Sequence, residues 1–220
     1  MNKEIKIGVG IITMGARELK DYKLSHQSEL YVFTDHNRVG PATGRNECIK
    51  HLYDKGCDYI FLMDDDCFPT RYGWEEYFIS NANKHNIHFL GLPEIFTSKV
   101  TSFDEDHELC YWDGIVGCFN FQTRHFIDVV GYYNTAYNRY GYEDAGRNYR
   151  AVCAGLTGAV GHYPSLLRAS SYIHSEDVYG ECPTANISHE DKMAYIEENR
   201  SLYMEEVNSG KIYYPFTTKQ

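Results

Sequence analysis

Residues 59–69, YIFLMDDDCFP, place three adjacent aspartates directly after an apolar run and before a proline. The run DYIFLM (58–63) is continuously hydrophobic, which is typical of a strand buried on both faces of a sheet. IKIGVGIIT (5–13) has the same character, and YVFTD (31–35) is typical of a shorter strand that ends on an acid. Buried strands that alternate with helices form parallel sheets, so the sequence predicts an α/β fold with a mostly parallel sheet.

The segments between and after these strands predict helices. RNECIKHLYDKG (45–56) has an apolar face suited to a helix, and PATG (41–44) before it predicts a turn. The elements expected in the second half are a strand at 114–121, a short helix at 123–131, a loop that opens a helix at 140–155, and an amphipathic helix at 188–207 with a Ser188/Asp191 capping pair. The chain has no repeat and no Pro/Gly-rich linker, so we expect residues 1–220 to form a single domain.

Composition disfavours several classes of protein. The 220 residues carry a net charge of −10, and phosphate binding needs a basic surface, so a nucleic-acid partner is disfavoured. No apolar run is long enough to span a bilayer, and MNKEIKIGVGIIT lacks the cleavage pattern of a signal peptide. The seven cysteines include no CxxC, which disfavours a disulfide framework and a cysteine zinc site. We therefore expect a cytoplasmic protein without a membrane span.

The three aspartates suggest a metal site. Ligands of parallel sheets gather at the carboxyl ends of the strands, so Thr13, Asp35 and Asp64 to Asp66 should line one crevice. Three adjacent carboxylates repel one another unless a positive charge lies between them, and carboxylate oxygens are preferred ligands of Mg²⁺ and Mn²⁺. A solvated acidic turn that caps the next helix is the alternative interpretation.

From Tyr59 onward the sequence resembles the GT-A glycosyltransferases, which carry an Asp-x-Asp motif at this strand end, followed by a proline. Residues 116–150 resemble the C-terminal half of the β-1,4-galactosyltransferase type and related inverting family 2-like enzymes. The matching positions are Asp64 to Asp66, Pro69, Val116-Gly117, Phe126, Gly131-Tyr132 and Tyr140 to Asp144. His174 stands thirty residues past Asp144, which is similar to the spacing of the family's metal-binding histidine.

This resemblance covers most of residues 5–175 and implies the GT-A fold, a Rossmann-like central, mostly parallel sheet flanked by helices. It implies a nucleotide-binding half at about 1–70, an acceptor and catalytic half at about 71–180, and a C-terminal helix at about 188–208.

The resemblance also implies a role for each matching side chain. The residues implied to bind the UDP-sugar are Thr13, Arg17, Asp35 (uracil), Arg45 (phosphates), Asp64 (ribose) and Asp65. Asp66 and His174 are implied to hold Mn²⁺ or Mg²⁺. Asp144 is implied to be the catalytic base, with Glu143 orienting the acceptor or the donor sugar.

Most of these assignments have an alternative. Asp35 could stabilise a turn, and Arg45 could be a surface residue at the start of a helix. His162 is a rival metal ligand at a shorter spacing. Glu143 and Asp144 could be acids favoured by the dipole of a first helical turn.

The implied function is that of a metal-dependent inverting glycosyltransferase that moves a hexose (Gal, Glc or N-acetylhexosamine) from a UDP-sugar to a hydroxyl acceptor such as a glycan. Tyr140 and Tyr142 stand where the family carries Trp and Gly-Gly, and Gly114 replaces an aromatic residue that limits the donor, so the donor sugar stays open. These two tyrosines and Trp112 could stack on sugar rings or lie in the core.

Three other functions share some of these features: glycosyl transfer to a hydroxymethylated DNA base, sugar nucleotidyl transfer, and sugar binding without catalysis. The sequence shows neither the stem nor the membrane anchor of Golgi members, so we expect a bacterial or viral (phage-encoded) enzyme.

Overall fold

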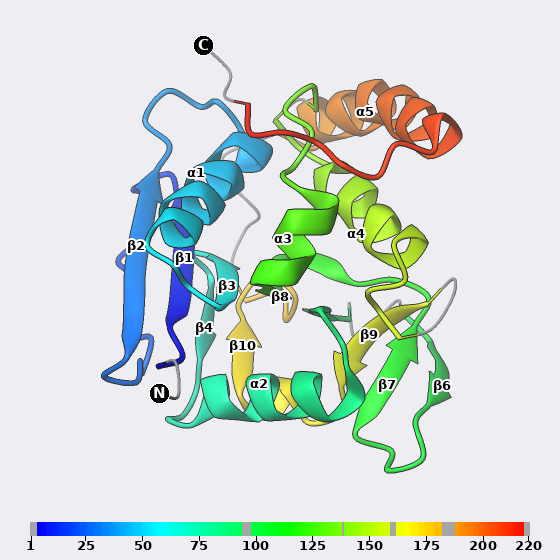
Figure 1. The fold of residues 1–220 in the computed structure, drawn as a ribbon. Helices are drawn as coiled ribbons and strands as arrows, with labels where there is room; N and C mark the ends of the chain where they lie inside the picture. The colour runs from blue at the N-terminus through cyan, green and yellow to red at the C-terminus, as the bar shows by residue number, and fades with distance from the viewer. Residues whose placement is uncertain (1–3, 94–97, 138, 159–161, 182–187, 218–220) are drawn as a thin grey trace.

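A five-stranded mixed sheet forms the centre of the molecule (Figure 1). The computed structural model describes residues 4–93, 98–137, 139–158, 162–181 and 188–217. The strands, in spatial order, are β2 (Ser28–Thr34), β1 (Ile7–Thr13), β3 (Tyr59–Asp64), β8 (Val116–Thr123) and β5 (Phe89–Leu92). β1 pairs in parallel with β2 and β3, whereas β8 is antiparallel to both β3 and β5. Four strands therefore run in one direction and β8 runs in the other, which confirms the expected α/β fold.

Helices flank this sheet (Figure 1). They are α1 (Pro41–Asp54), α2 (Trp74–His85), α3 (Arg124–Val130), α4 (Glu143–Cys153) and α5 (His189–Ser209). α5 lies against α4, at the outside of the molecule (Figure 1). In the part of the chain that the structure describes, no helix is both long and apolar enough to cross a membrane.

Two smaller sheets extend the central one. β4 (Cys67–Pro69) pairs antiparallel with β10 (Ile173–Ser175), and this pairing sets His174 opposite Phe68. The second small sheet has the order β6 (Val100–Phe103), β7 (Leu109–Trp112) and β9 (Tyr163–Leu166), and a 3₁₀ turn, η1 (Ala169–Ser171), follows β9. The β4–β10 pair carries the chain after the aspartates toward His174.

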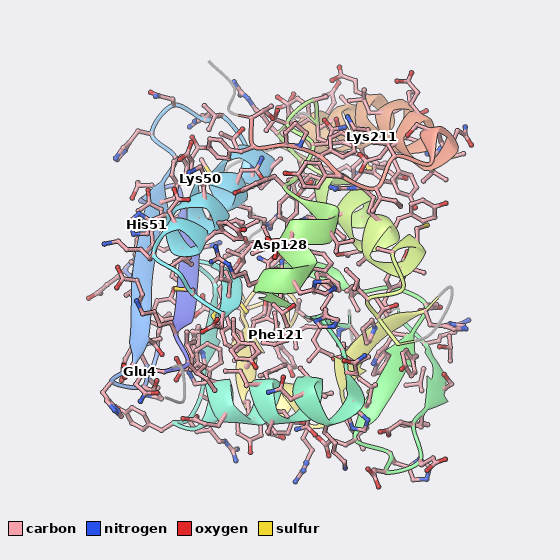
Figure 2. The ribbon with its side chains drawn as sticks, in the orientation of Figure 1. Glu4, Lys50, His51, Phe121, Asp128 and Lys211 are labelled. Atoms are coloured by element: carbon pink, nitrogen blue, oxygen red, sulfur yellow. The ribbon has the colours of Figure 1, made fainter. Side chains whose placement is uncertain are left out.

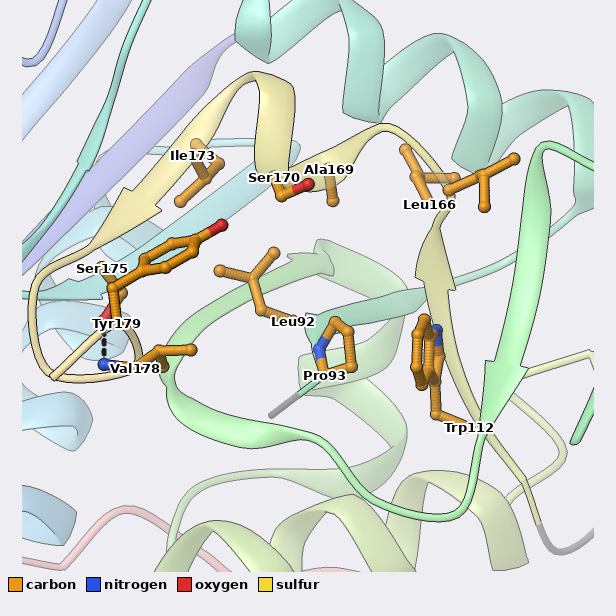
Figure 3. Close-up of a pocket in the computed structure, with 11 residues that line it drawn as sticks. Leu92, Pro93, Trp112, Leu166, Ala169, Ser170, Ile173, Ser175, Val178 and Tyr179 are labelled. Carbon is orange, nitrogen blue, oxygen red and sulfur yellow. Dashed lines mark hydrogen bonds between the residues drawn. The ribbon is translucent and has the colours of Figure 1, made fainter. Parts of the chain in front are cut away.

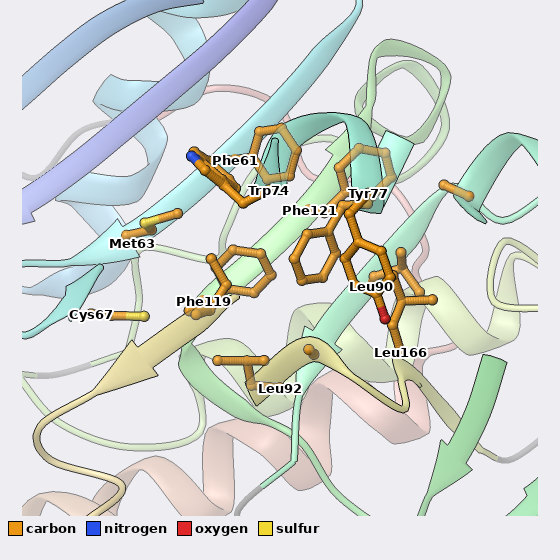
Figure 4. Packing of buried hydrophobic residues seen from close by; sticks show 14 of the residues in the cluster. Phe61, Met63, Cys67, Trp74, Tyr77, Leu90, Leu92, Phe119, Phe121 and Leu166 are labelled. Atoms are coloured by element: carbon orange, nitrogen blue, oxygen red, sulfur yellow. The ribbon is translucent and has the colours of Figure 1, made fainter. Parts of the chain in front are cut away.

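Each face of the central sheet buries its own hydrophobic cluster. Alternate residues of β3 point to opposite faces, so Phe61 belongs to one cluster and Leu62 to the other. The first cluster is rich in aromatic rings, and in it Phe61 packs against both Trp74 of α2 and Phe119 of β8 (Figure 4). Charged side chains such as Lys50 and Asp128 lie on the outside, whereas Phe121 lies inside (Figure 2).

Several expected elements are confirmed, with shifted ends. The strands expected at 5–13 and 58–63 are β1 and β3, and the helix expected at 188–207 is α5, which begins at the expected cap because Ser188 Oγ accepts a hydrogen bond from Asp191 N (3.0 Å). The turn expected at 41–44 is wrong. Those residues form the first turn of α1, because proline is tolerated at a helix start and Gly44 lies close to the sheet.

Candidate functional site

The carboxyl ends of β1, β2 and β3 meet at one edge of the sheet, as the sequence predicts. Asp64 is the last residue of β3, and Asp65 and Asp66 form the turn that follows. Thr13, at the end of β1, donates a hydrogen bond from Oγ1 to Asp65 Oδ2 (2.6 Å). Asp35 N donates to the Thr13 carbonyl oxygen (2.7 Å). The strand-end site, which we define as Thr13, Asp35 and Asp64 to Asp66, is therefore formed by three neighbouring strands.

Two arginines compensate the charges of the three aspartates. Arg17 Nη1 lies 2.8 Å from Asp65 Oδ1 and 3.2 Å from Asp66 Oδ2. Arg45 Nη2 donates to both oxygens of Asp64, at 2.9 and 3.1 Å. The Arg17 side chain is 29% exposed, whereas that of Arg45 is only 3% exposed. Guanidinium groups thus supply positive charge beside the three aspartates, where the sequence predicts a metal ion.

Arg45 also joins the strand-end site to the start of α4. Its Nη1 lies 2.8 Å from Oε1 of Glu143, a buried residue 98 positions further along the chain. Tyr142, with φ 70°, precedes Glu143 and ends the loop that leads into the helix. One buried guanidinium therefore bridges carboxylates from both halves of the chain.

Asp144 lies beside the start of β8. A Cβ atom added to Gly117 would be 2.8 Å from Asp144 Oδ2, so the carboxylate occupies the space that the glycine leaves open. Asp144 Oδ1 accepts a hydrogen bond from Ala145 N (2.9 Å), within the first turn of α4. The contact fixes Asp144 against the first residues of β8, which carry the expected Val116-Gly117 match.

Burial raises the pKa of the acids in this region. The pKa of Asp66 rises to about 6, first because the side chain is buried and second because Asp64 is nearby. Burial also raises the pKa values of Asp64, Glu143 and Asp144, and the charge of Arg45 opposes each of these shifts. Ionisation of these carboxyl groups is therefore costly unless a cation compensates it.

His174 lies on the strand that pairs with the segment after the aspartates. Glu176 N donates to the Asp66 carbonyl oxygen (2.9 Å), which holds the segment after β10 beside the aspartates. His174 Nε2 is 2.8 Å from Glu181 Oε2, and its ring stacks on Tyr179 with centroids 4.8 Å apart. A carboxylate and an imidazole are suitable donors for Mn²⁺, so Asp66, in the turn before β4, and His174, on the neighbouring β10, fit a divalent ion by type of ligand.

A different group brings three possible ligand atoms together. Among the residues that the structure describes, only His85, Asp104 and Asp106 place three such atoms within 4.8 Å of one another. They lie at the end of α2 and on the β6–β7 hairpin, and Lys84 pairs with Asp106. The strand-end site does not have a closed set of three ligands of this kind.

The remaining sequence candidates lie at varied places. Both carboxylate oxygens of Asp35 accept backbone hydrogen bonds, from Val39 N (2.9 Å) and Gly40 N (3.0 Å), so Asp35 stabilises the loop before α1. The Tyr142 ring stacks on Tyr203 of α5, with centroids 5.1 Å apart. His162 is half-buried and directly precedes β9.

Tyr140 and Trp112, the other two expected sugar-stacking residues, lie in different parts of the fold. Asn199 of α5 donates to the Tyr140 carbonyl oxygen (2.9 Å), so α5 holds the loop before α4. Trp112 ends β7 and lines a cavity that is described below.

Sequence reasoning missed the contacts that support the site. Glu181, the partner of His174, was not among the sequence candidates. Gly117 was matched by resemblance alone, and its packing against Asp144 is a contact that only the fold shows. The Arg45–Glu143 pair has no local sequence signal either, because helix and strand patterns do not report which side chains meet across the fold.

Comparisons with known proteins give a partial sequence relative and similar folds. No model of a protein family matches this sequence. Over 117 residues it is 32% identical to an uncharacterized glycosyltransferase of Acanthamoeba polyphaga mimivirus, covering 51% of this chain and 46% of that protein. The chain thus spans about half the length of this relative.

Among solved structures, S. aureus TarS is similar over 93% of this chain and 44% of the TarS chain, with a TM-score of 0.50 and 10% sequence identity. A shorter form of TarS, solved in complex with UDP, matches 91% of this chain and 72% of its own, with a TM-score of 0.48 and 11% identity. The chain therefore has an α/β fold, a mixed central sheet flanked by helices, that is similar to the fold of TarS.

Proposed function

We propose that this chain is a metal-dependent inverting glycosyltransferase that transfers a hexose from a UDP-sugar to a hydroxyl acceptor. One observation carries the proposal: Arg45 joins the carboxylates at the end of β3 to the Glu143-Asp144 pair at the start of α4. A glycosyltransferase needs one part of its site to bind the nucleotide diphosphate and another to supply a base. In this proposal the β3 carboxylates belong to the first part and the Glu143-Asp144 pair to the second. The similarity to a viral glycosyltransferase supports the same reaction class.

The donor side consists of Asp64 to Asp66, with Arg17 and His174. Asp66 and His174 would hold a divalent ion, which when bound neutralises charge on the diphosphate leaving group. Arg17 already contacts Asp65 and Asp66 and is partly exposed, so it is the arginine better placed to meet a phosphate. Arg45 is buried between two carboxylates, so in this proposal it positions the site instead of binding phosphates.

The acceptor side consists of Asp144 and Glu143. An acceptor hydroxyl has a pKa far above neutrality and needs a base within hydrogen-bond reach. The raised pKa of Asp144 makes its carboxylate a better proton acceptor than an ordinary aspartate. Asp144 accepts the hydroxyl proton while the acceptor oxygen attacks the sugar carbon on the face opposite the leaving group, so the product has the inverted configuration.

The direct test is incubation of the protein with a panel of UDP- and GDP-sugars, Mn²⁺ and simple glycoside acceptors, with release of free nucleotide as the readout. The proposal expects release from a UDP-sugar and its suppression by EDTA. Asp144→Asn is the matched control for the chemical step. Absence of release from every donor, or release that EDTA and Asp144→Asn both leave unchanged, would contradict the proposal.

A further inference from the structure

A cavity of about 140 Å³ is lined in part by β10, the strand that carries His174, and has no part in the proposed mechanism. β5, β7, β9, η1, β10 and the segment after β10 surround it (Figure 3). Leu92, Trp112 and Tyr179 face the same space from different sides (Figure 3). Leu167 and Ser170, the exposed members of the lining, indicate where it opens to solvent.

The lining is chemically unsuited to a hydroxylated ring. Apart from Ser170, Ser175 and the two aromatic residues, its side chains are aliphatic. Ser175 Oγ accepts a hydrogen bond from Val178 N (3.4 Å), and the Trp112 indole N–H donates to Cys110 Sγ (3.3 Å). The hydroxyl groups of a bound hexose would find few partners here, and each buried hydroxyl without a partner weakens binding.

The same lining suits one flat apolar ring. Aromatic rings pack against one another in stacked or edge-to-face arrangements, and Trp112 and Tyr179 offer two such surfaces. An apolar cavity of roughly 150 Å³ is enough to hold benzene in another protein. Size and chemistry therefore both match a single aromatic ring.

The position of the cavity connects it to both sides of the proposed active site. Tyr179 stacks on His174, and Ser175 pairs with Cys67, which directly follows Asp66. On the other side, Leu92 pairs with Val116, the neighbour of the glycine against which Asp144 packs. A ring in this cavity would be held close to the metal-side segment and to the start of β8.

We infer that this cavity binds the aromatic ring of a hydroxyl-bearing acceptor. The binding of the ring stands on the cavity alone, whereas its role as part of an acceptor rests on the proposed function. The acceptor class assigned by this cavity is an aryl-substituted alcohol or aryl glycoside.

Fluorine NMR tests ring binding without any donor or metal. The probes are 4-fluorophenol and 2-fluoro-2-deoxyglucose, each titrated with the protein. The inference expects broadening of the 4-fluorophenol signal and no effect on the sugar. Ala169→Leu, which places a larger side chain in the cavity lining, should weaken the phenol's binding by about tenfold or more. If this variant does not fold, Val178→Phe fills the cavity from a half-buried position.

Leu30→Phe, at an exposed position on β2, is the control substitution and should leave phenol binding unchanged. No broadening by the phenol, equal broadening of both probes, or full binding to the filled variants would overturn the inference. Because these titrations contain no donor, their failure is distinct from a failure to release nucleotide.

A second arm tests the role of the ring in the acceptor. Phenyl β-glucoside should have a kcat/KM about tenfold above that of methyl β-glucoside, and Ala169→Leu should remove the difference. Equal kcat/KM values for the two glucosides would overturn the acceptor assignment.

Discussion

Arg45 is the residue on which the site most depends. Its buried guanidinium pairs with Asp64 and Glu143, and the negative charge of Asp64 raises the Arg45 pKa although burial alone would lower it. Arg45→Met leaves Glu143 buried without its cation, so we expect a loss of about 3–5 kcal/mol in the free energy of unfolding, measured by urea denaturation. Arg139→Met, at an exposed position, should change it by less than about 0.5 kcal/mol. Equal stability of the two variants would show that the bridge is dispensable.

Gly117 sets the position of Asp144, and Gly114 supplies a matched control three residues earlier. Gly117→Ala would place a Cβ 2.8 Å from Asp144 Oδ2, whereas a Cβ at Gly114 would be no closer than 3.6 Å to Ser98 Oγ. A displacement of about 1 Å can cost about 10²-fold in rate, so Gly117→Ala should lower kcat by about that factor while Gly114→Ala does not. The measurement is steady-state kinetics with each variant. A kcat for Gly117→Ala equal to that of Gly114→Ala would contradict the placement of Asp144.

At the scale of elements, the β4–β10 pairing favours His174 over His162 as the proposed metal ligand. His174 lies on β10, opposite Phe68, and Phe68 is close along the chain to Asp66. His162, in contrast, precedes β9, which belongs to another sheet. His174→Ala should weaken Mn²⁺ binding at least about tenfold, measured by calorimetry, and His162→Ala should not. Equal effects, or a reversed order, would mean that the ligand is misassigned.

The elements that could be predicted from sequence are those with a strong local pattern. β1 and β3 are continuous apolar runs, and α5 begins at a capping serine, so each was expected. The first turn of α1 was missed because proline and glycine also mark turns. A Cβ at Gly44 would lie 2.9 Å from Ile12, so this glycine serves close packing of the helix on the sheet, which only the assembled fold shows.

The candidate site also has a part that the sequence predicts and a part that only the fold shows. The acids at the end of β3 were expected because strand ends in α/β sheets converge by topology. The contacts of Arg45 with Glu143 and of Asp144 with Gly117 join distant segments, and no local pattern encodes them. β4 and β10 have three residues each, too few for an alternating pattern to identify them.

At the scale of the whole molecule, the buried acids make stability depend on pH. The pKa of Asp66 is about 6 in the folded protein, above the value of about 3.9 for an exposed aspartate. Between these values the folded state binds more protons than the unfolded state, so Asp66 destabilises the protein increasingly as the pH rises through this window. At neutral pH the ionisation of Asp66 lowers the free energy of unfolding by at most about 3 kcal/mol.

Asp66→Asn removes this titration. In metal-free buffer, the free energy of unfolding of the wild type relative to Asp66→Asn should fall as the pH rises from about 4 to about 7. Urea denaturation at several pH values measures the difference. A difference that stays constant, or that grows with pH, would contradict the burial of an unfavourable charge at Asp66.

In the proposed function, donor binding and proton removal belong to opposite sides of one site, and the Asp144→Asn variant separates the two. Asparagine keeps the size of the side chain but cannot accept the proton, so the loss should fall on the chemical step. The measurement pairs turnover with the Kd for UDP in the same preparation. The expected result is that kcat falls by about 10²–10⁴-fold while the Kd for UDP stays unchanged. Turnover close to that of the wild type, or a loss of UDP binding as large as the loss of turnover, would contradict it.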